Sequence, residues 1–113
     1  MHNNFDPNTI YQKLISAGEA WARAEGMANQ LEELKKPLLA QLKLSSPEKA
    51  DSARETWAMA QEEYRNHIEG MVAARLDANV KRVRYKAAEA WVEAKRTEQA
   101  TRRVEARLAG VAV

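Results

Sequence analysis

The side chains that could do metal or acid–base chemistry in this sequence are few and far apart. Its two histidines are His2 and His67, and Glu63 lies four residues before His67, which puts both side chains on one face of a helix. One such pair supplies too few ligands for a metal ion. We therefore interpret His67 as a boundary residue that bonds to a carboxylate or a carbonyl group, and we predict no metal site.

Neither the carboxylates nor the loops indicate an active site. The pairs Glu32-Glu33 and Glu62-Glu63 lie among lysine, glutamine and arginine. This is typical of a solvated helix face, whereas a catalytic dyad needs burial and a cleft. The sequence has no cysteine, no glycine-rich phosphate loop and no nucleophile elbow. We expect no catalytic residue, no cofactor and no small-molecule substrate.

Basic side chains gather in the last third of the chain. Residues 1–74 carry a net charge of −3, whereas residues 75–113 carry +5, and the whole chain carries +2. A basic helix face can follow the phosphates of a nucleic acid. It can equally be a solvated face whose arginines pair with glutamates of the same helix or of a second chain. The side chains that we predict to contact nucleic acid or another partner are Arg82, Arg84, Lys86, Lys95, Arg96, Arg102, Arg103 and Arg107.

Two long helices must position these side chains. Asp6 followed by Pro7 is typical of a helix start. Over residues 10–42, apolar or small residues recur mainly at alternating spacings of four and three, the heptad pattern of a coiled coil. We predict a first helix over residues 8–44, with a kink near Pro37, over residues 33–37, because proline cannot donate a backbone hydrogen bond.

A turn and a longer helix follow. A Ser-Ser-Pro segment predicts a turn over residues 45–47, and no strong stop occurs before Gly110, so we predict one helix over residues 48–108. In this helix we predict that Leu76, Val80 and Val83 lie on the core face, toward the first helix. We expect frayed ends at residues 1–7 and 109–113. A short connection makes two helices antiparallel neighbours. The predicted fold is all-α, a single-domain, coiled-coil-like antiparallel hairpin with an extended C-terminal helix.

The second helix is too long for the first to cover. At about 1.5 Å per residue the two helices span roughly 55 Å and 90 Å, so cover ends at about residue 84. An exposed apolar stripe beyond that point should pack on another chain, giving a dimer or a higher oligomer. The alternative is a sharp break near residues 77–79 that folds residues 80–108 back as a third helix. The residues that we predict at the oligomer interface are Ala87, Trp91, Ala94, Glu98 and Leu108.

Side chains of two kinds in the apolar stripes need particular partners. Trp21, Trp57 and Trp91 indicate core or interface packing, with base stacking as the alternative. The cover of Trp91 has to come from another chain or a ligand. Glu98 is a carboxylate inside the stripe, and burying it alone is costly. We expect it to pair with Arg102 or with an arginine of a second chain, which would fix the register of the two chains.

The sequence also carries predictions about the compartment. The N-terminus has no basic region followed by an apolar one, so we predict no signal peptide. No apolar run of about 18 residues occurs, so we predict no membrane span. We expect a cytoplasmic protein, in the host cell if the gene is phage-encoded.

The second half of the chain resembles a group of short helical proteins encoded in bacteriophage and prophage genomes. The resembling positions cover about residues 60–105, and they are residues 64–70, Ala74, Asn79, Arg84-Tyr85 and residues 91–103. Members of that group tend to lie near phage recombination and replication genes and have no assigned catalytic activity. The resemblance implies an accessory role in phage DNA metabolism and no defined active site. Its matched positions of most interest are Arg96, Glu98, Arg102 and Arg103.

These observations give a leading interpretation and three alternatives. We expect a non-enzymatic helical oligomer, a phage accessory protein in DNA recombination or replication that acts through its basic C-terminal helix. The first alternative is an adaptor or inhibitor that binds a host or phage enzyme and makes no nucleic-acid contact. The second is a coiled-coil spacer. The third is a secreted helical-hairpin substrate, which ranks last because the Trp-x-Gly turn of that family is missing at residues 45–47.

Overall fold

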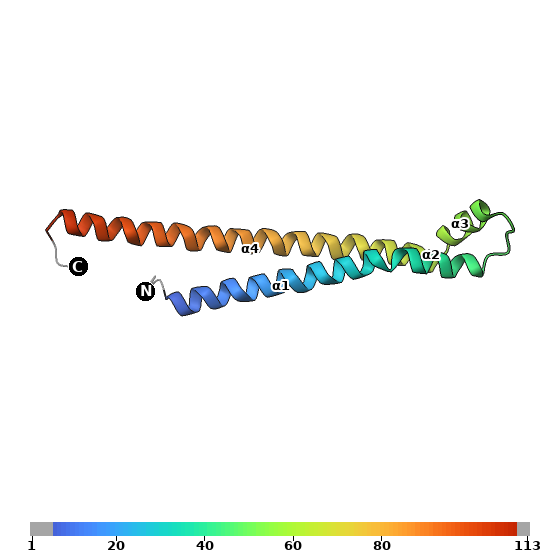
Figure 1. Ribbon diagram of the computed structural model, residues 1–113, viewed down its shortest axis with the longest axis horizontal. Coiled ribbons are helices and arrows are strands. Elements are labelled where there is room, and N and C mark those ends of the chain that lie inside the picture. The colour runs from blue at the N-terminus through green and yellow to red at the C-terminus, as the bar shows by residue number, and fades with distance from the viewer. Residues whose placement is uncertain (1–5, 111–113) are drawn as a thin grey trace.

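The computed structural model describes residues 6–110, and almost all of them are helical (Figure 1). No strand occurs in this stretch, which confirms the predicted all-α class. The molecule is a rod of 86 × 22 × 19 Å. The predicted frayed ends lie largely outside the described residues. The helices are α1 (Pro7–Glu33), α2 (Lys35–Leu44), α3 (Asp51–Met59) and α4 (Glu62–Leu108).

The start of α1 follows from the residue pair Asp6-Pro7. Asp6 is the N-cap, and its carboxylate accepts hydrogen bonds from the backbone N–H of Asn8 at 3.1 Å and from the hydroxyl of Thr9 at 2.9 Å. These bonds, that from the Thr9 hydroxyl above all, lower the pKa of Asp6 below its ordinary value. Pro7 occupies the first helical position, where a missing N–H costs nothing.

A one-residue interruption at Leu34 separates α1 from α2. Its N–H points to the carbonyl oxygens of Gln30 and Glu32. The helical path then resumes, because the N–H of Leu38 donates to Leu34 at 3.0 Å. Pro37 has no N–H with which to reach the carbonyl of Glu33, so the hydrogen-bond ladder is weakest here. This interruption lies within residues 33–37, where we predicted a kink.

The single helix expected over residues 48–108 is not continuous. Helix α3 begins only at Asp51 and ends at Met59, and α4 begins after Gln61, whose backbone is extended (φ −72°, ψ 146°). The side-chain amide of Gln61 donates to the carbonyl of Trp57 at 2.9 Å and satisfies one acceptor at the end of α3. The prediction was wrong because neither glycine nor proline marks this break.

Tertiary packing explains the break between α3 and α4. By turning back, α3 brings Ala58 into a cluster with Leu42 of α2 and Tyr64 of α4, and Trp57 packs against the same cluster. Ala58 has no exposed surface there. Burial of this apolar group offsets the helical hydrogen bonds that are absent at the turn.

The short helix α3 is also tied to α2 by polar contacts. The guanidinium of Arg54 donates to the carbonyl of Lys43 at 3.2 and 3.0 Å, which satisfies an acceptor in the last turn of α2. The ammonium of Lys43 lies 2.8 Å from the carboxylate of Asp51. Its hydrogen bond and charge hold the pKa of Asp51 below its ordinary value.

Helices α1 and α4 lie side by side along most of the rod (Figure 1). Their contacts run in reverse order along the two chain segments: Leu31 meets His67 and Trp21 meets Tyr85. At the middle of the pair, buried alanines face one another, and small side chains let two helices approach closely. This alanine cluster contains Ala24, Ala28 and Ala78, with Ala74 packed against it.

The cover that α1 gives to α4 extends further than the expected residue 84. The guanidinium of Arg96 lies over the ring of Tyr11, 5.2 Å from its centroid. Because α3 folds back, residues 51–61 take no part in the long pairing, and α4 starts beside α2 (Figure 1). The segment that extends past α1 is therefore only residues 97–108. Helix α4 is unbroken at residues 77–79, so the alternative of a third helix folded back from that point is not what the structure has.

Candidate functional site

Helix α4 presents two apolar stripes on different sides. The inner stripe faces α1, and at its start α2 and α3, and includes the buried residues Tyr64, Ala78 and Val92. The second stripe repeats at alternating spacings of four and three without a charged residue, and every member is exposed. We call it the outer seam, and it consists of Leu76, Val80, Val83, Ala87, Ala90, Ala94, Thr97, Thr101, Val104 and Leu108.

The outer seam corrects the predicted core of the long helix. Leu76, Val80 and Val83 were expected to face the first helix, but they are 64%, 40% and 61% exposed. Ala78, two residues from Leu76 and roughly 200° around the helix, is buried instead. The prediction placed the larger aliphatic side chains in the core, but these side chains lie on the exposed side of α4. The alanines of α1 pack against the smaller side chain.

The predicted interface residues lie in or beside the outer seam. Ala87, Ala94 and Leu108 belong to it and are exposed. Trp91 is 46% exposed, and Lys95 lies 5.7 Å from its ring centroid. Glu98 is half-buried beside the seam.

Part of the cover of Trp91 comes from α1 of the same chain. Trp91 lines an apolar groove of about 260 Å³ together with Ile10 and Leu14, where α4 passes the first turns of α1. Another chain or a ligand is thus not needed to cover one side of this indole.

Glu98 finds its partners within its own helix. Its carboxylate accepts from Lys95 at 3.3 Å and from Arg102 at 2.5 Å. The predicted pairing with Arg102 is therefore present inside one chain. The interchain version of that pairing stays a prediction.

The eight predicted basic contact residues divide into two groups. Four pair with a glutamate of the same helix: Lys86 with Glu89, Lys95 and Arg102 with Glu98, and Arg96 with Glu93. The other four have no carboxylate at ion-pair distance within residues 6–110. These four unpaired arginines are Arg82, Arg84, Arg103 and Arg107.

An aromatic pair between α1 and α4 lies beside one of the paired cations. Trp21 and Tyr85 stack at 5.5 Å between centroids, and the ammonium of Lys86 lies 5.9 Å from each ring. Gly18 makes room for this stack, because a Cβ atom there would lie 3.1 Å from the ring of Tyr85. Contacts of this kind favour a structural role for Lys86.

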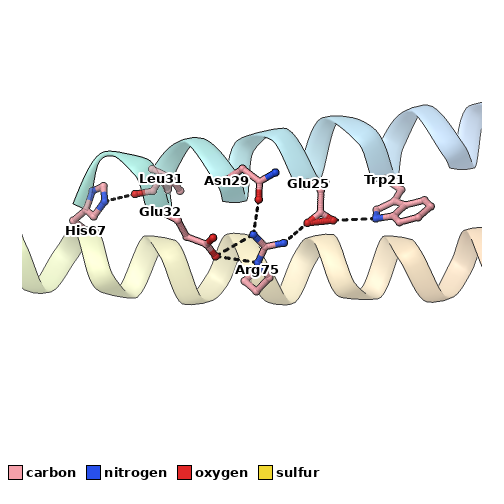
Figure 2. A network of polar contacts seen from close by, with 7 residues as sticks. All are labelled: Trp21, Glu25, Asn29, Leu31, Glu32, His67 and Arg75. Atoms are coloured by element: carbon pink, nitrogen blue, oxygen red, sulfur yellow. Dashed lines mark hydrogen bonds and ion pairs between the residues drawn. The ribbon is translucent and has the colours of Figure 1, made fainter. Parts of the chain in front are cut away.

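A polar network between α1 and α4, shown in Figure 2, was not anticipated from the sequence. The guanidinium of Arg75 donates to Asn29 at 2.8 Å, to Glu32 at 3.0 Å and to Glu25. Glu25 also accepts from the indole N–H of Trp21 at 3.3 Å. Hydrogen bonds from Arg75 to Glu25 and then to Glu32 raise the pKa of Arg75 above its ordinary value.

The signal for this network lies on α1 rather than on Arg75. Glu25, Asn29 and Glu32 follow one another at spacings of four and three, so their side chains share one helix face. One arginine with several donors can pair with such a face. Three acceptors on one helix and one donor group on the other fix the register of α1 against α4.

His67 takes part in the same helix pair (Figure 2). Its Nε2 atom lies 2.6 Å from the carbonyl oxygen of Leu31. This confirms the interpretation of a boundary histidine bonded to a carbonyl group, and Glu63 is not the partner. Within the part of the chain that the structure describes, no three histidine or carboxylate side chains are placed to hold a metal ion.

The long helices do not have the composition of membrane segments. Over the described residues, none combines the length and the apolar character that crossing a bilayer requires.

Comparison with models of protein families, with characterised proteins and with solved structures gives no match to this chain.

Proposed function

We propose that this protein is a non-enzymatic, antiparallel helical hairpin that self-associates through the outer seam and binds DNA through arginines of α4. In this proposal it is a phage accessory protein in recombination or replication, and it acts in the cytoplasm of the host. It uses no cofactor, metal or small-molecule substrate. The resemblance of residues 60–105 to phage proteins is the support for the phage setting.

The unpaired arginines carry the DNA-binding part of the proposal. Each can pair with a phosphate without breaking an ion pair within its own helix, so no such pair has to be given up on binding. Arg82, Arg103 and Arg107 lie within roughly 60° of one another at 100° per residue, and they span about 38 Å along the helix. Arg103 and Arg107 are exposed and lie on the segment that extends past α1, so the other described helices of the same chain do not cover them.

A titration of labelled DNA at two salt concentrations tests this proposal. We expect wild-type affinity to fall steeply between about 50 and 200 mM salt. Replacing Arg82, Arg103 and Arg107 by glutamine should weaken binding to duplex DNA. It should lower the slope of log affinity against log salt by about 0.9 for each phosphate that the variant no longer neutralises.

A second triple variant provides the matched control. Arg23, Lys36 and Arg65 are exposed and lie outside the C-terminal half of α4, so their replacement by glutamine removes the same net charge elsewhere. This variant should keep the wild-type slope. Equal decreases in affinity in the two triple variants, or no wild-type binding at low salt, would overturn the direct DNA contact.

The glutamates of α4 favour one alternative partner, an acidic protein surface. Glu89, Glu93, Glu98 and Glu105 alternate with the basic residues, and such a mosaic fits a protein better than a uniform line of phosphates. In that case the protein is an adaptor or inhibitor of a host or phage enzyme. Capture of a specific enzyme from nuclease-treated lysate by the wild type, but not by the Arg82, Arg103 and Arg107 variant, would favour this alternative over DNA.

A further inference from the structure

We infer that the outer seam pairs with the outer seam of a second copy of this chain, in antiparallel sense, about a two-fold axis at residue 92. This inference rests on the self-association in the proposed function and is independent of DNA binding. It adds the sense of the pairing and its register.

The first support is the position of the seam on α4. The seam lies roughly 200° around the helix from buried Ala78, so α1 covers the opposite side. Its ten positions keep the four-and-three spacing from Leu76 to Leu108, and none of them is charged. A second helix can therefore pack along about 50 Å of α4 without displacing α1.

The second support is that the seam is nearly the same when read from either end. Leu76 and Leu108 are equally far from residue 92, and so are Val80 and Val104. The positions nearest to residue 92 are alanines, which allow close approach at the axis. A two-fold axis requires that if residue i contacts residue j, then j contacts i. Antiparallel pairing about residue 92 meets this condition with large side chains opposite large ones.

The ends of the seam favour the antiparallel over the parallel sense. In antiparallel pairing, Leu76 lies opposite the last residue of α4, so the paired segment ends where the apolar seam ends. In parallel pairing the same spacing, extended toward the N-terminus, places Glu69 and Glu62 beside their own copies. Like charges at such positions destabilise a helix pair.

The flanking charges give one attractive contact in the antiparallel pair. Arg84, one of the unpaired arginines, lies opposite Glu98 of the partner copy, and symmetry makes this contact twice. The parallel pair instead places Glu93 opposite Glu98 of the partner copy. These placements follow from the heptad positions on either side of the seam.

The antiparallel pair also brings some carboxylates together. Asp77 approaches Glu105 of the partner copy, and Glu93 approaches its own copy. Asp77 is already paired with Lys81 at 2.7 Å and Glu93 with Arg96 at 3.1 Å. These intrachain pairs reduce the repulsion across the interface.

Disulfide cross-linking tests the sense directly, because the native chain has no cysteine. Ala87→Cys and Thr97→Cys are exposed seam variants. In the antiparallel pair, position 87 lies opposite position 97, so a mixture of the two variants should give a mixed disulfide. Each variant alone should not cross-link, because a position and its own copy are about 15 Å apart along the helix. A disulfide needs Cα atoms about 4.4–6.8 Å apart.

The controls separate the possible failures. Ala22→Cys, exposed on α1, reports random collisions. Light scattering on wild type should give about twice the monomer mass of 12.8 kDa. Ala90→Glu in the seam should give the monomer mass, and Ala22→Glu should not.

A monomeric wild type would overturn self-association altogether, whereas a dimer in which Ala87→Cys cross-links to itself would overturn only the antiparallel sense. Neither result depends on the DNA titration.

Discussion

Arg75 of α4 donates a 2.8 Å hydrogen bond to Asn29 of α1, and the same guanidinium reaches Glu25 and Glu32 (Figure 2). The three acceptors lie on consecutive turns of α1, so only one axial position of α4 satisfies them together. The neighbouring cluster consists of alanines, whose short side chains do little to prevent α4 from shifting along the axis of α1. Arg75 therefore fixes the register of α4 against α1, which the alanine contacts alone do not fix.

Replacing Arg75 by glutamine tests this role. We expect a lower midpoint of thermal unfolding, because Glu25 and Glu32 lose their shared donor group. Arg65→Gln on the same helix is the matched control, since Arg65 is exposed. Circular dichroism against temperature measures both variants. If the two variants have the same midpoint of thermal unfolding, Arg75 does not stabilise the pairing of α1 with α4.

The inner and outer stripes of α4 predict different tolerance to larger side chains. Ala78→Leu should cost about 1–3 kcal/mol in the free energy of unfolding, because Ala78 has no exposed surface and faces two alanines of α1. Ala73→Leu, exposed on the same helix, should stay within about 0.5 kcal/mol of wild type. Urea titration measures both. The reverse order would mean that α1 covers the other stripe.

Two glycines of α1 offer another matched comparison. An added Cβ at Gly26 would meet nothing within 4 Å, so Gly26→Ala should stabilise the protein by about 1 kcal/mol through helix propensity. At Gly18 the same atom would lie 3.1 Å from the ring of Tyr85, which must shift. Gly18→Ala should therefore be the less stable variant in the same urea titration. A larger gain in stability from Gly18→Ala than from Gly26→Ala would show that the ring of Tyr85 can shift at little cost in free energy.

The helical class could be predicted because many residues contribute to it. Composition, heptad spacing and the cap at Asp6 all favour helices, and the structure has helices in those places. The break before Glu62 could not be predicted, because it depends on the burial of Ala58 against Leu42 and Tyr64, which come from three different helices. Only the packed structure shows that this burial outweighs a straight helix.

The face of α4 that meets α1 was the harder problem. Two stripes with helical spacing overlap on this helix, and the one with Leu76, Val80 and Val83 is the more apolar. Hydrophobicity alone selects that stripe as the core. The correct choice depends on fit, since Ala24 and Ala28 leave room for Ala78 and not for a leucine. The basic residues of α4 can be listed from the sequence, but which of them pair within the helix depends on side-chain geometry.

The ion pair between α2 and α3 predicts a dependence on pH. Lys43 lowers the pKa of Asp51 below its ordinary value of 3.8, so this pair stabilises the folded state above that pH. The contribution should disappear as pH falls through the lower folded-state pKa. Asp51→Asn should therefore be less stable than wild type at about pH 7, and this difference should be smaller at about pH 2. Urea titrations at both values measure this, with Glu48→Gln as an exposed control, and a constant difference would contradict it.

The contact between Arg84 and Glu98 of a second copy predicts the result of a charge exchange. Arg84→Glu should weaken the dimer several-fold, because it places two carboxylates together at each of two symmetric sites. Glu98→Arg should weaken it as well, and it also removes the intrachain partner of Lys95 and Arg102. The double variant restores opposite charges across the interface, so its dimer should be tighter than that of either single variant. Exposed pairs contribute about 0.2–1 kcal/mol each, and the two-fold axis doubles the effect.

Sedimentation equilibrium gives the dissociation constant of each variant in this exchange. The control is Arg82→Glu, which changes the charge by the same amount but lies away from the predicted contact. A parallel pair places Arg84 opposite Asn79 of the partner copy, so there the double variant has no reason to recover. Recovery in the double variant but not in Arg82→Glu combined with Glu98→Arg would tie the effect to this one contact. If the double variant weakens the dimer by the sum of the two single effects, Arg84 does not contact Glu98 of the partner copy. The charge argument for the antiparallel pair then fails.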